Sequence, residues 1–167
     1  LRVVQAYGNF LERTKRGAEA RKLYSAFLEG GDRNPLIAIA LHGAEAGKVP
    51  QPFIASPMFG VGEAMFSLGS ALAEDQGLEV ALVYAQLAAA SNGDPAVANT
   101  LLGDILEDME RFEAAISAYE AVKPDSVLRS NAEIEMAVNL QWLERGAEAK
   151  AKLGALIAKE PANYEAI

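Results

Sequence analysis

The 167-residue sequence contains no cysteine, one histidine and one tryptophan, and aromatic residues make up only 7% of it. Without cysteine the chain can form neither a disulfide nor a thiolate zinc site, although this absence does not fix the redox compartment. The single histidine, His42, has no second histidine, cysteine or acidic pair at metal-ligand spacing. We therefore expect no metal site and no cofactor.

Positive charge is also scarce, since 15 Lys and Arg residues stand against 23 Asp and Glu residues and give a net charge of −8. Proteins bind a phosphate backbone through clustered Lys and Arg, so nucleic acid is excluded as the expected partner. No apolar run approaches the roughly 18 residues that a membrane span requires. We expect a soluble chain without membrane insertion, and its localisation is unknown because the sequence does not distinguish cytoplasm from periplasm.

Catalytic patterns are missing as well. The glycines between residues 60 and 69 do not follow a strand, as a phosphate-binding loop would require. Serine and threonine residues share no motif with a histidine or lysine base. The carboxylates of Glu107, Asp108 and Glu110 fall within one helical turn, which is typical of a solvated helix face. We predict that the protein is not an enzyme.

Helical periodicity is clearest between residues 101 and 122. Two apolar sets at helical spacing flank a polar Glu110-Arg111 corner: Leu102, Ile105, Leu106 and Met109, then Phe112, Ala115, Ile116, Tyr119 and Val122. This pattern predicts a helical hairpin. Gly103 costs about 1 kcal/mol relative to alanine inside a helix, so we expect it to let the second helix approach through the small Ala115.

The hairpin pattern recurs along the chain. Ala115 has counterparts at Ala81 and Ala149, both at a distance of 34 residues (115 − 81 = 34 and 149 − 115 = 34). A further copy contains Ala20, and its offset of 81 − 20 = 61 residues is 34 + 27. The sequence therefore predicts repeats at 1–34, 62–95, 96–129 and 130–163, a helix plus proline-rich insert at 35–61, and the start of a truncated further repeat at 164–167.

The most regular copy resembles the tetratricopeptide repeat, a helical hairpin with a 34-residue period. The resemblance is carried by Leu102-Gly103, Leu106, Ala115 and Tyr119. It implies an all-α, right-handed superhelical solenoid of antiparallel helical hairpins, and a scaffold or adaptor function in binding other proteins. Because the last residues resemble the opening of another repeat, we expect the sequence to be a fragment of a longer protein.

The insert departs from the hairpin pattern. Asn34-Pro35 predicts a helix start, with a helix over about 35–46. Three prolines between residues 48 and 58 predict extended or turned backbone there. Its apolar residues, including Phe53, either pack on neighbouring helices or form an exposed docking loop, and the sequence leaves both alternatives open.

In a stack of such hairpins the first helices line a concave groove. The candidate partner-binding residues on these faces are Asn9, Arg13, Phe66, Ser70, Glu74, Thr100, Asp104, Glu107, Asp108, Ile134, Gln141 and Trp142. The acidic middle of the groove excludes a carboxylate clamp and indicates a basic or amphipathic protein segment as ligand. Trp142 is interpreted either as an interface anchor or as core for a following repeat.

The sequence thus predicts a non-catalytic scaffold that binds a partner protein or peptide in its concave groove. The alternative is a structural segment that self-assembles into a homo-oligomer through stacked repeats or exposed ends. The sequence does not identify the partner.

Overall fold

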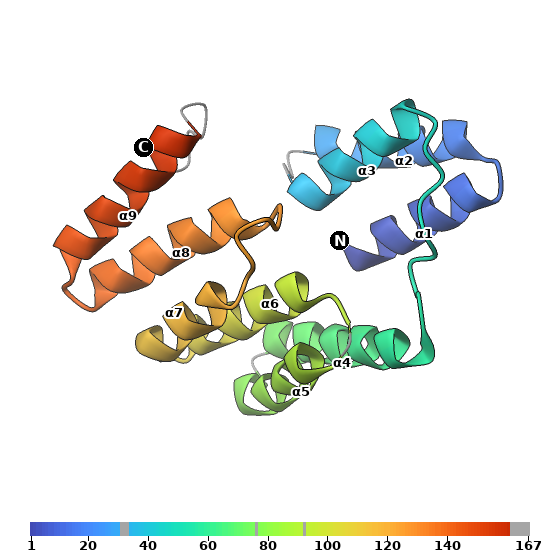
Figure 1. Cartoon of the computed structure of the whole chain (residues 1–167). Helices are drawn as coiled ribbons and strands as arrows, with labels where there is room; N and C mark the ends of the chain where they lie inside the picture. The colour runs from blue at the N-terminus through green and yellow to red at the C-terminus, as the bar shows by residue number, and fades with distance from the viewer. Residues whose placement is uncertain (31–33, 76, 92, 161–167) are drawn as a thin grey trace. The chain divides into compact units, whose positions relative to one another are not determined.

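A computed structural model describes residues 1–30, 34–75, 77–91 and 93–160, and all regular secondary structure within these ranges is α-helical. The chain divides into two compact units, Leu1–Ser56 and Pro57–Ile167. The helices are α1 (Arg2–Arg13), α2 (Gly17–Glu29), α3 (Pro35–Glu45), α4 (Pro57–Glu74), α5 (Leu78–Ala90), α6 (Pro95–Asp108), α7 (Phe112–Glu120), α8 (Arg129–Trp142) and α9 (Gly146–Lys159) (Figure 1). The predicted all-α class is confirmed, and the predicted repeat start at 164–167 lies outside the described residues.

The first unit is one hairpin with a third helix packed on it. Helix α3 contacts both α2 and α1, and it begins where the sequence predicts, because the Asn34 side chain accepts a hydrogen bond of 3.0 Å from the Leu36 amide and Pro35 takes the first helical position. The core of the unit is built by Leu11, Ala20, Tyr24, Ile37 and Ala44.

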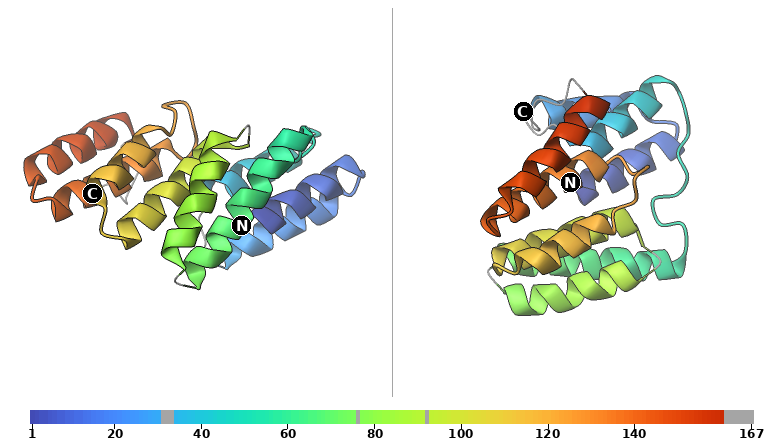
Figure 2. Two further views of the ribbon diagram at one scale, coloured as in Figure 1. Left: turned by 90° about the horizontal axis from the view of Figure 1, so that it is seen from below. Right: turned by 60° about the vertical axis from the view of Figure 1, so that its left-hand side comes forward.

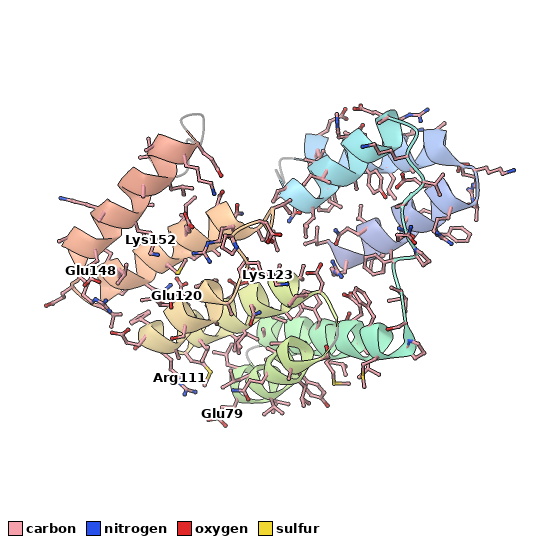
Figure 3. All side chains as sticks on the ribbon, in the orientation of Figure 1. Glu79, Arg111, Glu120, Lys123, Glu148 and Lys152 are labelled. Carbon is pink, nitrogen blue, oxygen red and sulfur yellow. The ribbon has the colours of Figure 1, made fainter. Side chains whose placement is uncertain are left out.

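The second unit is an array of three hairpins, α4–α5, α6–α7 and α8–α9. Each helix packs on the one before and the one after it, and α4 also contacts α6. Figure 2 shows these helices following one another as antiparallel neighbours. Charged side chains such as Glu79 and Glu148 are exposed and point outward from the array (Figure 3). Contacts between sequence neighbours define a solenoid.

Helix α4 starts earlier than the sequence predicts. It begins at Pro57, whereas the insert was expected to extend to residue 61. Proline is tolerated in the first turn of a helix, where its missing amide hydrogen would have no partner. The residues from 57 to 61 therefore belong to the first helix of the hairpin. The backbone from 46 to 56 lacks helix, in agreement with the non-helical backbone predicted for most of 48–58.

The hairpin turns share one geometry. The carbonyl oxygens of Leu11, Leu72, Leu106 and Leu140 each accept a hydrogen bond of 2.8 Å from the amide five residues later. In three of these turns the residue before that amide has a positive φ: Lys15 (64°), Glu110 (57°) and Glu144 (60°). This is the arrangement that ends a helix through one left-handed residue. The recurring leucine thus supplies the carbonyl oxygen that accepts the hydrogen bond closing each of these turns.

Gly103 lies against an aromatic ring that the sequence analysis did not assign to it. A Cβ atom added to Gly103 would lie 2.5 Å from Cε1 of Tyr119, and the three atoms nearest to it all belong to that ring. Ala115, on the same helix as Tyr119, is fully buried. The same pairing occurs in the first unit, where a Cβ on Gly8 would meet the ring of Tyr24. Glycine therefore makes room for a tyrosine that crosses from the second helix of the hairpin.

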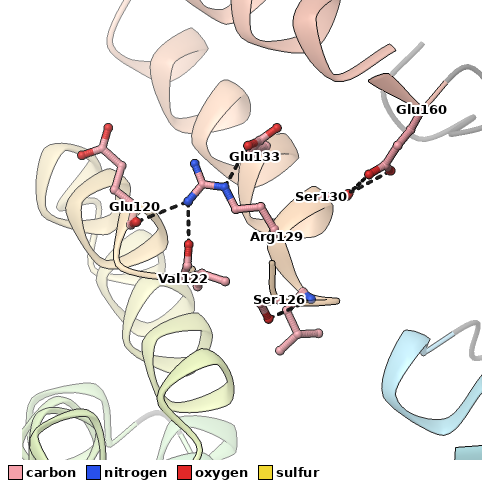
Figure 4. Close-up of polar contacts among 8 residues, drawn as sticks. Glu120, Val122, Ser126, Arg129, Ser130, Glu133 and Glu160 are labelled. Atoms are coloured by element: carbon pink, nitrogen blue, oxygen red, sulfur yellow. Dashed lines mark hydrogen bonds and ion pairs between the residues drawn. The ribbon is translucent and has the colours of Figure 1, made fainter. Parts of the chain in front are cut away.

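Helix α7 ends at Glu120, and an arginine hydrogen-bonds to the carbonyl groups at its end. Arg129 Nη1 donates to the carbonyl oxygens of Val122 (2.6 Å) and Glu120 (3.3 Å), while its Nε donates to Glu133 at 2.8 Å (Figure 4). The Ser126 hydroxyl accepts a hydrogen bond of 3.2 Å from the amide of Leu128, the residue that precedes the first turn of α8. Arg129 thereby links α7 to α8.

Candidate functional site

A cluster of polar groups, here called the acid cluster, lies on α6 and consists of Asp104, Glu107 and Asp108. The Tyr119 hydroxyl lies 2.7 Å from Asp104 Oδ1, to which it donates, and 3.4 Å from Glu107 Oε2. Asn139 Nδ2, from α8, donates to Glu107 Oε2 at 2.7 Å. The structure therefore brings together three of the predicted binding residues.

The environment of Asp104 is unusual for an accessible carboxylate. Asp104 as a whole residue is exposed to solvent. Partial burial of its carboxylate nevertheless raises the pKa of that group to about 6. The Tyr119 hydrogen bond lowers this pKa, and the negative charges of Glu107 and Asp108 raise it. Three neighbouring carboxylates therefore favour a positively charged partner group at this site.

Two members of the surrounding network escaped the sequence analysis. Tyr119 was identified only as a core aromatic, and Asn139 was not singled out. Asn139 is fully buried, and its Oδ1 has no hydrogen-bond partner among the described residues. The sequence did hold a signal for Asn139, because this polar residue occupies the position of the apolar Ile105 in the preceding repeat (139 − 105 = 34).

The predicted residues Asn9 and Arg13 contact the chain's own proline-rich segment. Asn9 Nδ2 donates to the Gln51 carbonyl oxygen at 2.8 Å, and Asn9 Oδ1 accepts from the Phe53 amide at 3.2 Å. Arg13 Nη1 donates to the Pro50 carbonyl oxygen at 3.0 Å. The segment therefore lies on α1 and is held there by these hydrogen bonds. Its apolar residues are only partly covered, because Ile54 is 46% exposed.

A hollow of about 400 Å³ lies between α1, α3 and this segment. Tyr24 contributes to its lining, and its hydroxyl donates to Glu12 Oε1 at 2.9 Å. The other apolar lining residues are Ile39, Ala40, Val49, Pro50 and Phe53. The volume is in the range of small ligand pockets, and one wall of the hollow is made by the segment itself.

Several other predicted groove residues are engaged within the fold. Phe66 packs against the core cluster that contains Ala85 and Ile105. The Thr100 hydroxyl donates to the Ala96 carbonyl oxygen of its own helix at 2.9 Å. Three further predicted residues of α4 and α8 differ in exposure: Ser70 and Ile134 are partly buried and Glu74 is exposed.

Trp142 lies at the end of α8 and stacks on the preceding hairpin. Its ring centroid lies 6.0 Å from that of Phe112, with 10° between the planes, and the residue is 66% exposed. Gln141 Oε1 lies toward the α8–α9 turn, because a Cβ on Gly146 would be 3.3 Å from it. Both residues are thus held near hairpin turns, and the interpretation of Trp142 as an anchor stays a prediction.

Metal-binding clusters and membrane-spanning helices are absent from the described part of the chain. No group of three or more His, Cys, Asp or Glu side chains there is placed to hold a metal ion. None of the helices described is long and apolar enough to cross a membrane.

The sequence matches no protein-family model and no curated protein. Two solved structures are similar in fold. One is YrrB, described as a TPR protein with an unusual peptide-binding site, at 18% identity and a TM-score of 0.57, covering 96% of this chain and 86% of YrrB. The other is the C-terminal part of a TPR repeat-containing protein from Cytophaga hutchinsonii, at 14% identity and a TM-score of 0.57, covering 96% of this chain and 66% of that one. The chain therefore has the helical-repeat fold of tetratricopeptide-repeat proteins.

Proposed function

We propose that this protein is a non-catalytic interaction scaffold that binds a basic segment of a partner protein at the acid cluster. The observation that carries the proposal is the position of Asp104, which is open to solvent and carries a raised pKa beside two further carboxylates. Tyr119 donates a hydrogen bond to Asp104 and Asn139 donates one to Glu107, and neither donor is charged. A lysine or arginine side chain would supply the missing charge.

The fold and the overall charge support the same function. The neighbour YrrB is described as having a peptide-binding site, and arrays of helical hairpins offer extended surfaces for such ligands. The net charge of −8 disfavours acidic partners and raises the rate of association with basic ones.

The test uses a fluorescent lysine-rich peptide and the same peptide with glutamate at each lysine. The wild-type chain binds the lysine peptide, and added salt weakens the binding. Asp104→Asn combined with Glu107→Gln weakens it about tenfold, as expected for the loss of charge-assisted hydrogen bonds. Glu79→Gln, which removes an exposed charge from α5, is the control and leaves the affinity unchanged.

Fluorescence anisotropy measures these affinities, and circular dichroism checks that the double variant keeps its helices. Equal binding of the lysine and glutamate peptides, or wild-type affinity in the double variant, would exclude the acid cluster as the binding site.

A further inference from the structure

The proline-rich residues 48–55 lie on α1 in the manner of a bound peptide. The segment runs antiparallel to the helix, because Pro50 is bonded near its end at Arg13 while Phe53 lies over Arg2 near its start. The Arg2 guanidinium carbon is 4.7 Å from the centroid of the Phe53 ring, within the range of a cation–π contact. Figure 1 shows the segment passing beside α1 without helical structure.

The contacts of Asn9 are of a kind that recognises extended backbone. Its carboxamide donates to the Gln51 carbonyl oxygen and accepts from the Phe53 amide, so one side chain satisfies the main chain on both sides of Pro52. Such bonds depend on an extended main chain and hardly on the side chains of the occupant. A linker between two units needs no such pair of bonds.

The segment is held by polar contacts rather than by apolar burial. Gln51 and Pro52 are exposed, Val49 is 67% exposed, and Phe53 is only partly buried. The hydrogen bonds of Asn9 to Gln51 and of Arg13 to Pro50 are themselves exposed to solvent. Contacts of this kind open locally more easily than a packed core does.

We propose that this face of α1 is a peptide-binding site, and that residues 50–53 are its internal occupant. The partner is an extended, proline-containing protein segment with an aromatic residue after its second proline, which exchanges with residues 50–53. The hollow beside Tyr24 and Ile39 gives the incoming segment room for a further apolar side chain. This site is in the first unit and uses none of the carboxylates of the acid cluster.

Because residues 50–53 belong to the same chain as their binding site, an external partner would bind weakly to the unaltered protein. An internal segment competes at a high effective concentration, and the apparent affinity of an external peptide falls with the fraction of open sites. Weakening the internal occupant should therefore strengthen binding of the external one.

The experiment uses a fluorescent peptide with the sequence of residues 48–55, KVPQPFIA, added to the full chain. In Phe53→Ala the internal segment loses its contact with Arg2, so the peptide binds at least about tenfold more tightly than to wild type. Ile54→Ala is the matched control, because it removes an exposed apolar side chain from the same segment, and it leaves the affinity at the wild-type value. Adding Asn9→Ala to Phe53→Ala abolishes the gain.

Hydrogen exchange at the Phe53 amide gives a second readout in the unaltered chain. This amide exchanges through local opening, faster than the amides of the buried core around Leu11, and excess KVPQPFIA peptide leaves the core rates unchanged. The proposal is overturned if the peptide binds Phe53→Ala no better than wild type, or if the Phe53 amide exchanges only at the rate of the core.

Discussion

At the scale of single residues, two glycines and two tyrosines connect the packing of the hairpins to their surface. Tyr119 passes over Gly103, and its hydroxyl reaches the carboxylate of Asp104. Tyr24 passes over Gly8 in the same way, and its hydroxyl reaches Glu12. The aromatic ring is thus a core residue while its hydroxyl belongs to the polar face.

Gly103→Ala tests this contact. The new methyl group would meet the Tyr119 ring, so the free energy of unfolding falls by about 1–3 kcal/mol despite the better helix propensity of alanine. Gly154→Ala is the control, since a Cβ there has nothing within 4 Å, and it raises the free energy of unfolding by up to about 1 kcal/mol. Urea unfolding followed by circular dichroism measures both, and a stabilised Gly103→Ala would contradict the contact.

At the scale of elements, three hairpin turns place a residue other than glycine at a position with left-handed backbone. Glu110 has a φ of 57° and joins α6 to α7. Left-handed backbone costs a non-glycine residue about 1 kcal/mol, whereas glycine adopts it readily.

Glu110→Gly is therefore expected to raise the free energy of unfolding by about 0.5–1 kcal/mol, because the strain at this φ is removed. Ala114→Gly, inside α7, should lower it by about 1 kcal/mol. The two variants add the same residue to one hairpin, so thermal melts that move in the same direction would show that the turn is not strained.

At the scale of the whole molecule, the sequence predicts the helices well because their signals are local. Capping residues such as Asn34 and Asp94 fix helix starts, and apolar periodicity fixes the buried faces. The start of α4 at Pro57 was missed because a proline in a first turn and a proline in a loop have the same sequence signal.

The candidate site was less accessible to sequence reasoning. The predicted carboxylates do lie together, since Asp104 and Glu107 are on one helix face. The two hydrogen bonds of Asn9 to residues 51 and 53 join positions more than 40 apart in sequence, and no local sequence pattern encodes them. The contact of Gly103 with the Tyr119 ring was not predicted, because the spacing of residues gives the register of two helices but not the direction of a side chain.

The raised pKa of Asp104 has a consequence for the thermodynamics of binding. A bound cation stabilises the ionised carboxylate, so the pKa of Asp104 falls on binding, and near pH 6 the complex releases protons into the buffer. Affinity for a basic peptide then rises as the pH increases through 6 and levels off above it. Calorimetry at pH 6 in buffers of different ionisation enthalpy should give different apparent binding enthalpies for the wild-type chain. Asp104→Asn should remove most of that difference, and an unchanged buffer dependence in this variant would assign the released proton to another group.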